Sequence, residues 1–304
     1  MKVSVYHIHL FPLIFFMISC GQPEAVDQEN LEGDSENYIE ATLRSREKAG
    51  NGNWKVVESK EKWDPAKTAI IIVDMWDKHW CESASERVEE IAPVMNTVVN
   101  QAREKGIMII HAPSGTMEAY KDYPQRKRAQ EMAPHTPPEN IQLEQWCYLD
   151  PDAEAALPID DSDGGCDKPC EDGKPCEEKA VWSSQTAAIA IHENDFITDS
   201  GQEVYNIFKE NGIENLIIMG VHTNMCVLGR PFAIRQMSNL GMNVVLMRDM
   251  TDAMYNPESR PKVDHFTGTD LVIEHIEKYW APTMLSSDLT GKLFFRFKED
   301  DRNL

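Results

Sequence analysis

The stretch Asn215-Leu216-Ile217-Ile218-Met219-Gly220-Val221-His222-Thr223-Asn224-Met225-Cys226-Val227 joins an apolar run to a short polar turn. Continuous apolar runs of this kind are typical of central strands in parallel sheets. Residues 228–240 then show a helical pattern. Cys226 is therefore predicted to lie in a strand-to-helix turn, where the helix dipole and free N–H groups favour a thiolate. The alternative is a buried cysteine that only packs the helix.

Similar apolar runs recur along the chain, at 68–73, 107–110, 187–191, 243–247 and near Met284. Helical patterns lie between them, at 85–105, 201–211 and 269–280. Alternating strands and helices indicate right-handed βαβ units. The predicted fold class is α/β: a three-layer α/β/α sandwich with a mostly parallel sheet of about six strands.

Several polar side chains stand at or just past the ends of these runs: Asp74, His111, His192 and the Cys226 turn. In open parallel sheets, ligands bind beyond the carboxyl ends of the strands. The fold is therefore expected to gather these residues on one rim.

Residues 112–186 form a long insertion between the second and third predicted strands. A plain connection is much shorter. The first part, 116–132, is charged and helical in pattern. We interpret the insertion as a lid-like cover over the rim, with a disordered excursion as the alternative.

The N-terminus has the features of a lipoprotein signal peptide, predicted for residues 1–20. Lys2 precedes a short apolar segment, and Met17-Ile18-Ser19-Cys20-Gly21 is similar to a lipobox, in which Cys20 is lipidated. An ordinary secretory signal or a buried strand is the alternative. Residues 21–53 are acidic and poor in large apolar residues, which predicts a flexible tether. A domain at 54–304 follows, on a protein expected to be lipid-anchored in a bacterial cell envelope, at the outer membrane or facing the periplasm.

The formal net charge is −21. This value argues against binding of nucleic acid or an anionic membrane surface by the folded domain. The expected partners are a small-molecule substrate, the membrane through the N-terminal lipid only, and further copies of the chain in a homo-oligomer.

Six cysteines remain after Cys20: Cys81, Cys147, Cys166, Cys170, Cys176 and Cys226. If Cys226 is a free nucleophile, five remain, and an odd number cannot all pair. The spacing of Cys166, Cys170 and Cys176 favours a local disulfide outside the cytoplasm. The sequence does not determine the connectivity.

Two motifs resemble the isochorismatase-like cysteine hydrolase superfamily, which includes nicotinamidase-related amidases. Residues 69–77, Ala-Ile-Ile-Ile-Val-Asp-Met-Trp-Asp, are similar to the family's first strand with its catalytic Asp, and residues 220–227 are similar to its nucleophile turn. Residues 244–249 also look like a later family strand with its following Asp. The resemblance spans roughly residues 63–287.

By this resemblance, Cys226 is the catalytic nucleophile and Asp74 is the base that takes its proton. The backbone N–H groups of His222 and Cys226 form the oxyanion hole, and a cis peptide bond falls at Val221-His222. The roles agree with chemistry, because a thiol needs a base to attack well and a developing oxyanion needs fixed donors.

One departure from the family concerns its catalytic Lys, which stands several residues before a Phe. In this chain that position falls near Ala190 or Ile191, and no Lys is there. We predict that His192 replaces it as cation and proton relay. The alternative is a surface histidine with no role.

Substrate-binding roles are predicted for Trp76, His79 and His111, which lie near the rim. No cofactor is expected. A divalent metal held by Asp77, His79 and His111 is a weaker alternative, because three scattered ligands lack a recognisable spacing.

The sequence therefore predicts a cysteine-dependent hydrolase of a small amide or related C–N bond. A non-catalytic small-molecule-binding protein on the same fold is the alternative, because the family Lys is missing. A thiol redox or metal protein is a third possibility.

Overall fold

A computed structural model describes residues 38–50, 52–292 and 294–302, all of which belong to one compact unit. The predicted signal peptide and lipidated Cys20 lie outside the described residues. Within the described part of the chain, no helix has the length and apolar character needed to cross a membrane.

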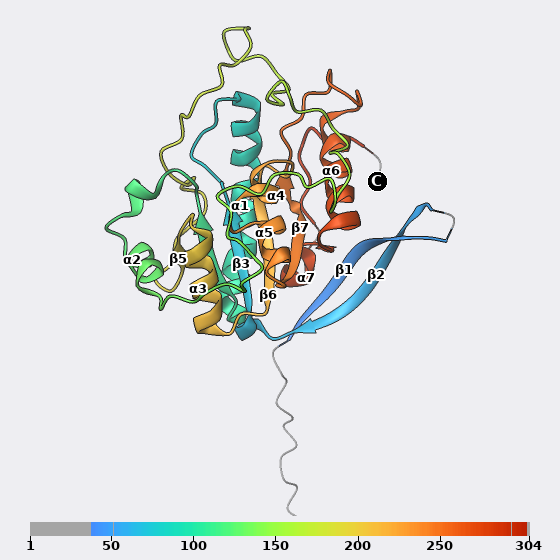
Figure 1. The fold of residues 1–304 in the computed structure, drawn as a ribbon. Helices are drawn as coiled ribbons and strands as arrows, with labels where there is room; N and C mark the ends of the chain where they lie inside the picture. Colours follow the sequence, from blue (N-terminus) through green and yellow to red (C-terminus); the bar gives the residue numbers. More distant parts are fainter. Residues whose placement is uncertain (1–37, 51, 293, 303–304) are drawn as a thin grey trace, which may run out of the picture. The chain divides into compact units, whose positions relative to one another are not determined.

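Eight strands form a single sheet in the order β2-β1-β8-β7-β6-β3-β4-β5 (Figure 1). Six of them are parallel to one another: β3 (Thr68–Val73), β4 (Met108–Ala112), β5 (Phe196–Ile197), β6 (Asn215–Val221), β7 (Asn243–Asp252) and β8 (Thr283–Met284). The α/β prediction with a mostly parallel sheet is thus confirmed, although the sheet has two more strands than expected.

The two additional strands are β1 (Ile39–Lys48) and β2 (Trp54–Trp63), an antiparallel hairpin whose strand β1 pairs with β8. The prediction of a flexible tether over 21–53 is therefore wrong for the part that contains β1. Every second residue at the start of β1 is buried, namely Ile39, Ala41 and Leu43. This alternation is short and lies among polar and charged residues, so it was not recognised as a strand in the sequence.

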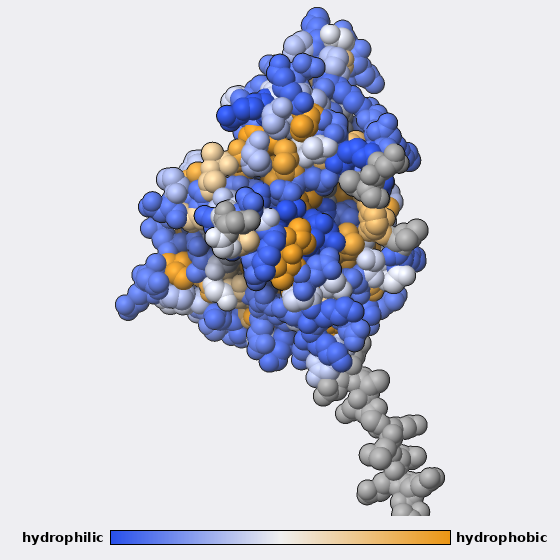
Figure 2. All heavy atoms as spheres, turned by 90° about the vertical axis from the view of Figure 1, so that its right-hand side faces the viewer, coloured by the Kyte–Doolittle hydropathy of each residue, from blue (hydrophilic) through white to orange (hydrophobic). Residues whose placement is uncertain are grey.

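Strand β2 forms the exposed edge of the sheet, and most of its residues are exposed. Figure 2 views the side of the molecule that carries this hairpin, and its surface is mostly hydrophilic with small, separated apolar patches. Strand β2 carries three lysines, Lys55, Lys60 and Lys62. Charged edge strands resist pairing with further strands.

Two clusters of buried apolar side chains, one on each face of the sheet, form the core. Alternate residues of β3 divide between them, with Ile71 and Val73 in one cluster and Ile70 and Ile72 in the other. The long helix α1 (Glu82–Lys105) covers the second face through side chains such as Ile91 and Met95. Helices α3 (Gly201–Asn211) and α6 (His265–Tyr279) contribute to the first cluster.

The helix predicted at 228–240 is divided into α4 (Cys226–Gly229) and α5 (Ile234–Asn239). Pro231 stands between them, and proline cannot donate the hydrogen bond that a continuous helix needs. The chain therefore turns directly after Gly229, which places Arg230 at the end of the nucleophile's own helical turn.

The third strand was predicted at 187–191. The strand that follows β4 in the structure is instead β5, which has only two residues. Residues 187–191 form loop instead, so the connection from β4 to β5 is longer than the predicted insertion. It contains the 3-10 helix η2 (Met117–Tyr120) and helix α2 (Pro124–Glu131), within the predicted charged segment. Strand β8 lies between β1 and β7 in the sheet, and the short helix α7 (Ser287–Thr290) follows it. The 3-10 helix η1 (Pro65–Lys67) precedes β3.

Candidate active site

Asp74 directly follows β3 and is completely buried. The Asp74 backbone is in the left-handed region, with φ of 46°. One carboxylate oxygen accepts a hydrogen bond from the backbone N–H of Ser114 at 2.7 Å, and the other accepts one from Arg230 Nε at 2.9 Å. Burial raises the pKa of Asp74, and the Arg230 charge opposes this shift. The ion pair therefore favours the ionised carboxylate in a buried position.

Cys226 begins α4 and is a free, buried cysteine. Its thiol interacts with Asp74 and with Arg230. Burial raises the pKa of Cys226 strongly, the nearby Asp74 charge raises it further, and the Arg230 charge lowers it. The resting side chain is therefore a thiol, with the Asp74 carboxyl group beside it.

The turn that carries Cys226 contains a cis peptide bond at Val221-His222, as the resemblance implied. Among the described residues, the backbone N–H of Cys226 donates to no other group, while the His222 backbone interacts with the Cys226 sulfur. The Cys226 N–H is thus available to a developing oxyanion, while the His222 backbone is engaged by the sulfur in this state.

Hydrogen bonds to β7 hold this turn in place. The Thr223 N–H donates to the carbonyl of Asp252, and the hydroxyls of Thr223 and Thr251 lie 2.7 Å apart. Gly220 has φ of 121°, and a Cβ there would lie 2.0 Å from the Val73 carbonyl oxygen. Only glycine lets β6 approach β3 so closely, directly before the turn.

A buried charge network supports the same region. Asp252 accepts from Arg87 at 2.7 Å and contacts His265 at 2.9 Å, and Asp167 contacts Arg87 at 3.0 Å. Despite burial, these cations hold the pKa of Asp252 well below its usual range. The Asp that the resemblance singled out, Asp249, instead binds the N–H and hydroxyl of Ser286.

Aromatic side chains lie beside the turn. The rings of Trp76 and Trp182 stack with centroids 4.3 Å apart, and His79 stacks on Trp182 at 5.8 Å. The His79 ring also contacts the His222 ring edge-on at 4.9 Å. Burial lowers the pKa of His79 to about 4, so this ring is neutral at physiological pH. Trp76 and His79 are thus near the turn, as the sequence predicted.

His111 is not available to a ligand, and its predicted substrate-binding role is wrong. The side chain is fully buried. One ring nitrogen lies 2.9 Å from Gln185 and the other 2.9 Å from Asp195, which also pairs with Arg103. Because His111 lies within β4, its side chain extends from one face of the sheet. It therefore does not lie beyond the end of the strand, where a ligand was expected.

His192 does not reach Asp74 or Cys226, so its predicted placement is also wrong. It lies with residues 106–109, at the beginning of β4. Asp74 instead follows the end of β3, and β3 and β4 run parallel. The error follows from the third strand, which lies later in the chain than predicted and places His192 at the opposite end of the sheet.

The cation at this site is Arg230. Its Nε donates to Asp74, and its guanidinium lies over the Trp146 ring, 5.4 Å from the centroid. Although burial opposes the charge, Asp74 raises the pKa of Arg230. One feature of the sequence indicates this position of Arg230, which is its spacing of four residues from Cys226. Residues four apart lie on the same face of a helical turn, and Pro231 ends the turn directly after Arg230.

Parts of the insertion lie against this rim. The Cys147 N–H donates to the Gly229 carbonyl at 2.7 Å, and Asn224 donates to Asp161 at 2.7 Å. Disulfides join Cys81 to Cys166 and Cys170 to Cys176. The predicted local disulfide is therefore Cys170–Cys176, while Cys166 attaches the cover to the start of α1.

The three residues considered as metal ligands are not brought together. Asp77 binds Ser183 and Ser184, and His111 binds Asp195. In the part of the chain that the structure describes, no group of three or more His, Cys, Asp or Glu side chains is arranged to hold a metal ion.

Comparison with protein families gives a match of residues 177–270 to the isochorismatase domain. The matched region includes Cys226 and Arg230 but not Asp74. A comparison with curated proteins gave no match.

Solved structures with a similar chain path include a cysteine hydrolase from Pseudomonas syringae pv. phaseolicola 1448A, with 15% identity and a TM-score of 0.42, covering 75% of this chain and 95% of that one. An isochorismatase family protein from Desulfovibrio vulgaris subsp. vulgaris str. Hildenborough has 14% identity and a TM-score of 0.42, covering 74% and 97%. An isochorismatase-like hydrolase from Alkaliphilus metalliredigens has 16% identity and a TM-score of 0.39, covering 75% and 96%.

Proposed function

We propose that this chain, of which residues 177–270 match the isochorismatase domain, is a cysteine-dependent hydrolase of a small amide or a related C–N bond. The observation that supports the proposal most strongly is the contact of the buried Cys226 thiol with Asp74, which is itself ion-paired to Arg230. A nucleophile, a base and a fixed cation thus lie together at the carboxyl ends of β3 and β6.

In the first half of the reaction, Asp74 accepts the thiol proton as the Cys226 sulfur bonds to the carbonyl carbon. The carbonyl electron pair moves to the oxygen, which receives hydrogen bonds from the N–H groups of His222 and Cys226. The C–N bond then breaks, and Asp74 returns its proton to the leaving nitrogen. The products are a free amine or ammonia and a thioester on Cys226.

In the second half, Asp74 takes a proton from a water molecule that attacks the thioester carbon. The same two N–H groups hold the oxyanion. The C–S bond breaks, the carboxylic acid leaves, and the sulfur recovers its proton from Asp74. Asp74 and Cys226 are returned to their starting states.

Arg230 acts on this cycle by its charge and position. Its pKa lies far above neutrality, so it stays protonated and relays no proton. It favours the ionised form of Asp74 and partly offsets the repulsion between that carboxylate and the developing thiolate. We therefore propose Arg230, in place of His192, as the substitute for the family Lys.

We further propose that Trp76 and His79, together with Trp182, contact the bound substrate. Their stacked rings beside the His222 turn offer an apolar wall with few hydrogen-bond donors. Such a surface suits a flat, uncharged substituent next to the amide. Lipidation at Cys20, attachment to the cell envelope and homo-oligomer formation stay proposals from the sequence.

A panel of small aliphatic and aromatic amides, assayed for ammonia or amine release with wild type and Cys226→Ala, tests the function. Hydrolysis by wild type of at least one amide, absent in Cys226→Ala, supports the hydrolase. The alternative of a binding protein predicts that amides bind equally to both proteins and that neither hydrolyses them.

A further inference from the structure

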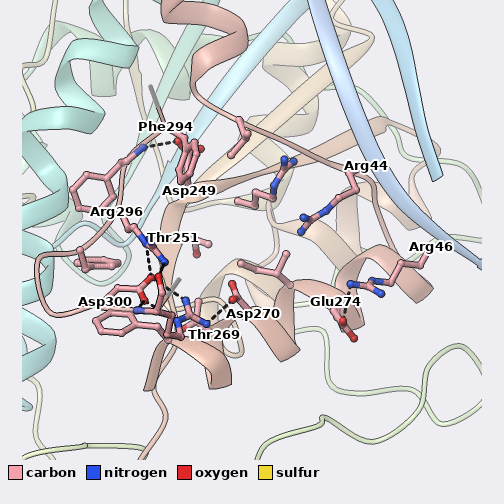
Figure 3. Close-up of a pocket in the computed structure, with 17 residues that line it drawn as sticks. Arg44, Arg46, Asp249, Thr251, Thr269, Asp270, Glu274, Phe294, Arg296 and Asp300 are labelled. Atoms are coloured by element: carbon pink, nitrogen blue, oxygen red, sulfur yellow. Dashed lines mark hydrogen bonds and ion pairs between the residues drawn. The ribbon is translucent and has the colours of Figure 1, made fainter. Parts of the chain in front are cut away.

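A cavity of about 450 Å³ lies away from the Cys226 turn, between β1, β7, α6 and the C-terminal segment 294–302. Figure 3 shows Arg44 and Arg46 on β1 at one side of it, and Phe294, Arg296 and Asp300 of the C-terminal segment at the other. Asp74, Cys226 and Arg230 are not among its lining residues. A space of this volume accommodates a small organic molecule.

The lining combines apolar and aromatic surface with side chains of both charges, including the carboxylates Asp249, Asp270, Glu274 and Asp300. The apolar residues are Phe266, Ile273, Leu285, Phe294, Phe295 and Phe297, and the cations are Arg44, Arg46, Arg248, Arg296 and Arg302. Pockets that bind small molecules commonly show this composition, with a largely apolar wall and a few polar groups that fix orientation.

Most of these arginines are already neutralised by carboxylates. Arg44 pairs with Glu277 at 2.7 Å, and Arg46 pairs with Glu274 at 2.6 Å. Arg302 pairs with Asp270 at 2.7 Å, and Arg296 pairs with Asp300 at 3.2 Å. Their charges are therefore compensated within the protein.

Arg248 differs from the other four. Its guanidinium donates to the Thr283 hydroxyl at 3.2 Å, and among the described residues it forms no ion pair. Its neighbour Asp249 binds Ser286 and the N–H of Phe295 instead. Burial and the nearby charge of Arg44 lower the pKa of Arg248, while the charges of Glu277, Asp249 and Asp288 oppose this shift without forming an ion pair with it. A half-buried guanidinium that has no directly paired carboxylate is stabilised when an anion approaches it.

We propose that this cavity is a second binding site, for a small organic carboxylate with an aromatic or aliphatic body. The carboxylate pairs with Arg248, and Arg's planar fork of donors suits a bidentate carboxylate. The apolar body lies against the phenylalanine side chains of the C-terminal segment. The site is separate from the proposed nucleophile, so it does not depend on the hydrolase activity.

The test is a fluorescence titration with 2-naphthoate, using 2-naphthylmethanol as the uncharged probe of the same shape. Wild type should bind naphthoate saturably at one site and bind the alcohol at least tenfold more weakly. Arg248→Met and Arg248→Gln should each weaken naphthoate binding at least tenfold. Arg46→Met, which removes a cavity arginine already paired with Glu274, should change it less than threefold.

Circular dichroism establishes that each variant is folded, and rising salt should weaken naphthoate binding in wild type. Blocking Cys226 with iodoacetamide, or replacing it by alanine, should leave the binding unchanged. The proposal is contradicted if wild type does not bind naphthoate at millimolar concentration, if Arg248→Gln binds it as well as wild type, or if blocked Cys226 abolishes binding. The last result assigns the ligand to the proposed active site instead.

Discussion

Arg230 Nε lies 2.9 Å from the buried carboxylate of Asp74, although the two residues are 156 positions apart in the chain. Asp74 ends a strand of the sheet, and Arg230 ends the helical turn that begins with Cys226. The ion pair thus connects the base to the nucleophile turn. It provides a fixed positive charge where a histidine from another loop was expected.

Removing the Arg230 charge should move the acidic limb of the pH profile of kcat/KM. Burial already raises the pKa of Asp74, and the Arg230 charge lowers it. In Arg230→Met the pKa of Asp74 therefore rises, and activity is lost at a higher pH than in wild type. Arg230→Lys keeps a charge and should shift the limb less.

His192→Ala is the control for this series. It should leave kcat/KM and its pH profile unchanged, because His192 lies at the beginning of β4 and not beside Asp74. A loss of activity in His192→Ala, with Arg230→Met unaffected, would restore the original assignment of the cation.

Replacing Asp74 by asparagine should separate turnover from thiolate formation. Loss of general-base catalysis should lower kcat by about 10²–10⁴-fold. The Asp74 charge also raises the pKa of Cys226, whereas Arg230 lowers it. The thiol of Asp74→Asn should therefore ionise at lower pH and react with iodoacetamide at least as fast as in wild type at pH 9. An unchanged kcat in Asp74→Asn would argue against Asp74 as the base.

Glu154 should stabilise the fold in a pH-dependent way. It is buried, accepts a hydrogen bond from Arg235 at 2.6 Å and contacts His275 at 2.6 Å. Although burial opposes the shift, these partners lower its pKa from 4.5 to about 2. The stabilisation is present above about pH 4.5 and is lost as the pH falls through about 2.

In Glu154→Gln at pH 7, Arg235 keeps a buried charge without its carboxylate. The free energy of unfolding should fall by about 3 kcal/mol. Denaturant titrations of both proteins should converge toward pH 2. An equal difference at pH 7 and pH 2 would contradict the charge-based explanation.

The two disulfides should differ in their effect on stability. Cys81–Cys166 closes a loop with a sequence separation of 85, and Cys170–Cys176 closes one with a separation of 6. The chain-entropy relation gives a loss of about 4–5 kcal/mol for the double serine variant of the first and about 2 kcal/mol for that of the second. Chemical unfolding of the two variants under oxidising conditions measures this difference. Equal losses would mean that native contacts of the cover, not loop closure, determine the effect.

Much of the fold was readable from the sequence because its central strands are apolar throughout. Residues 68–73 and 215–219 are predicted as strands and form β3 and β6. The hairpin β1–β2 was missed because only one face of β1 is buried and β2 is mostly exposed. A charged edge hairpin resembles a polar linker in composition.

The candidate site was predictable where a residue follows a well-defined strand, as Asp74 follows β3 and the Cys226 turn follows β6. His192 was misplaced because β5 has only two residues and gives a weak local pattern. The functional cation was hidden for a different reason. The contact of Arg230 with Asp74 joins the end of α4 to the end of β3, which lie 156 positions apart in the chain, and no local pattern reports such a contact.

The central claim, that Cys226 is the nucleophile, is tested most directly with p-nitrophenyl acetate, an activated ester that needs no knowledge of the natural substrate. Rapid mixing, acid quenching and peptide mass spectrometry locate any acetyl thioester. Cys147 is the internal control, because it is 8% exposed against 7% for Cys226, and burial raises its pKa to about 11. The assignment of Cys226 as the nucleophile predicts a burst of about one p-nitrophenolate per chain with the acetyl group on Cys226, abolished in Cys226→Ala and retained in Cys147→Ala. No burst, or acetyl thioester formed equally on Cys147 and Cys226, would contradict it.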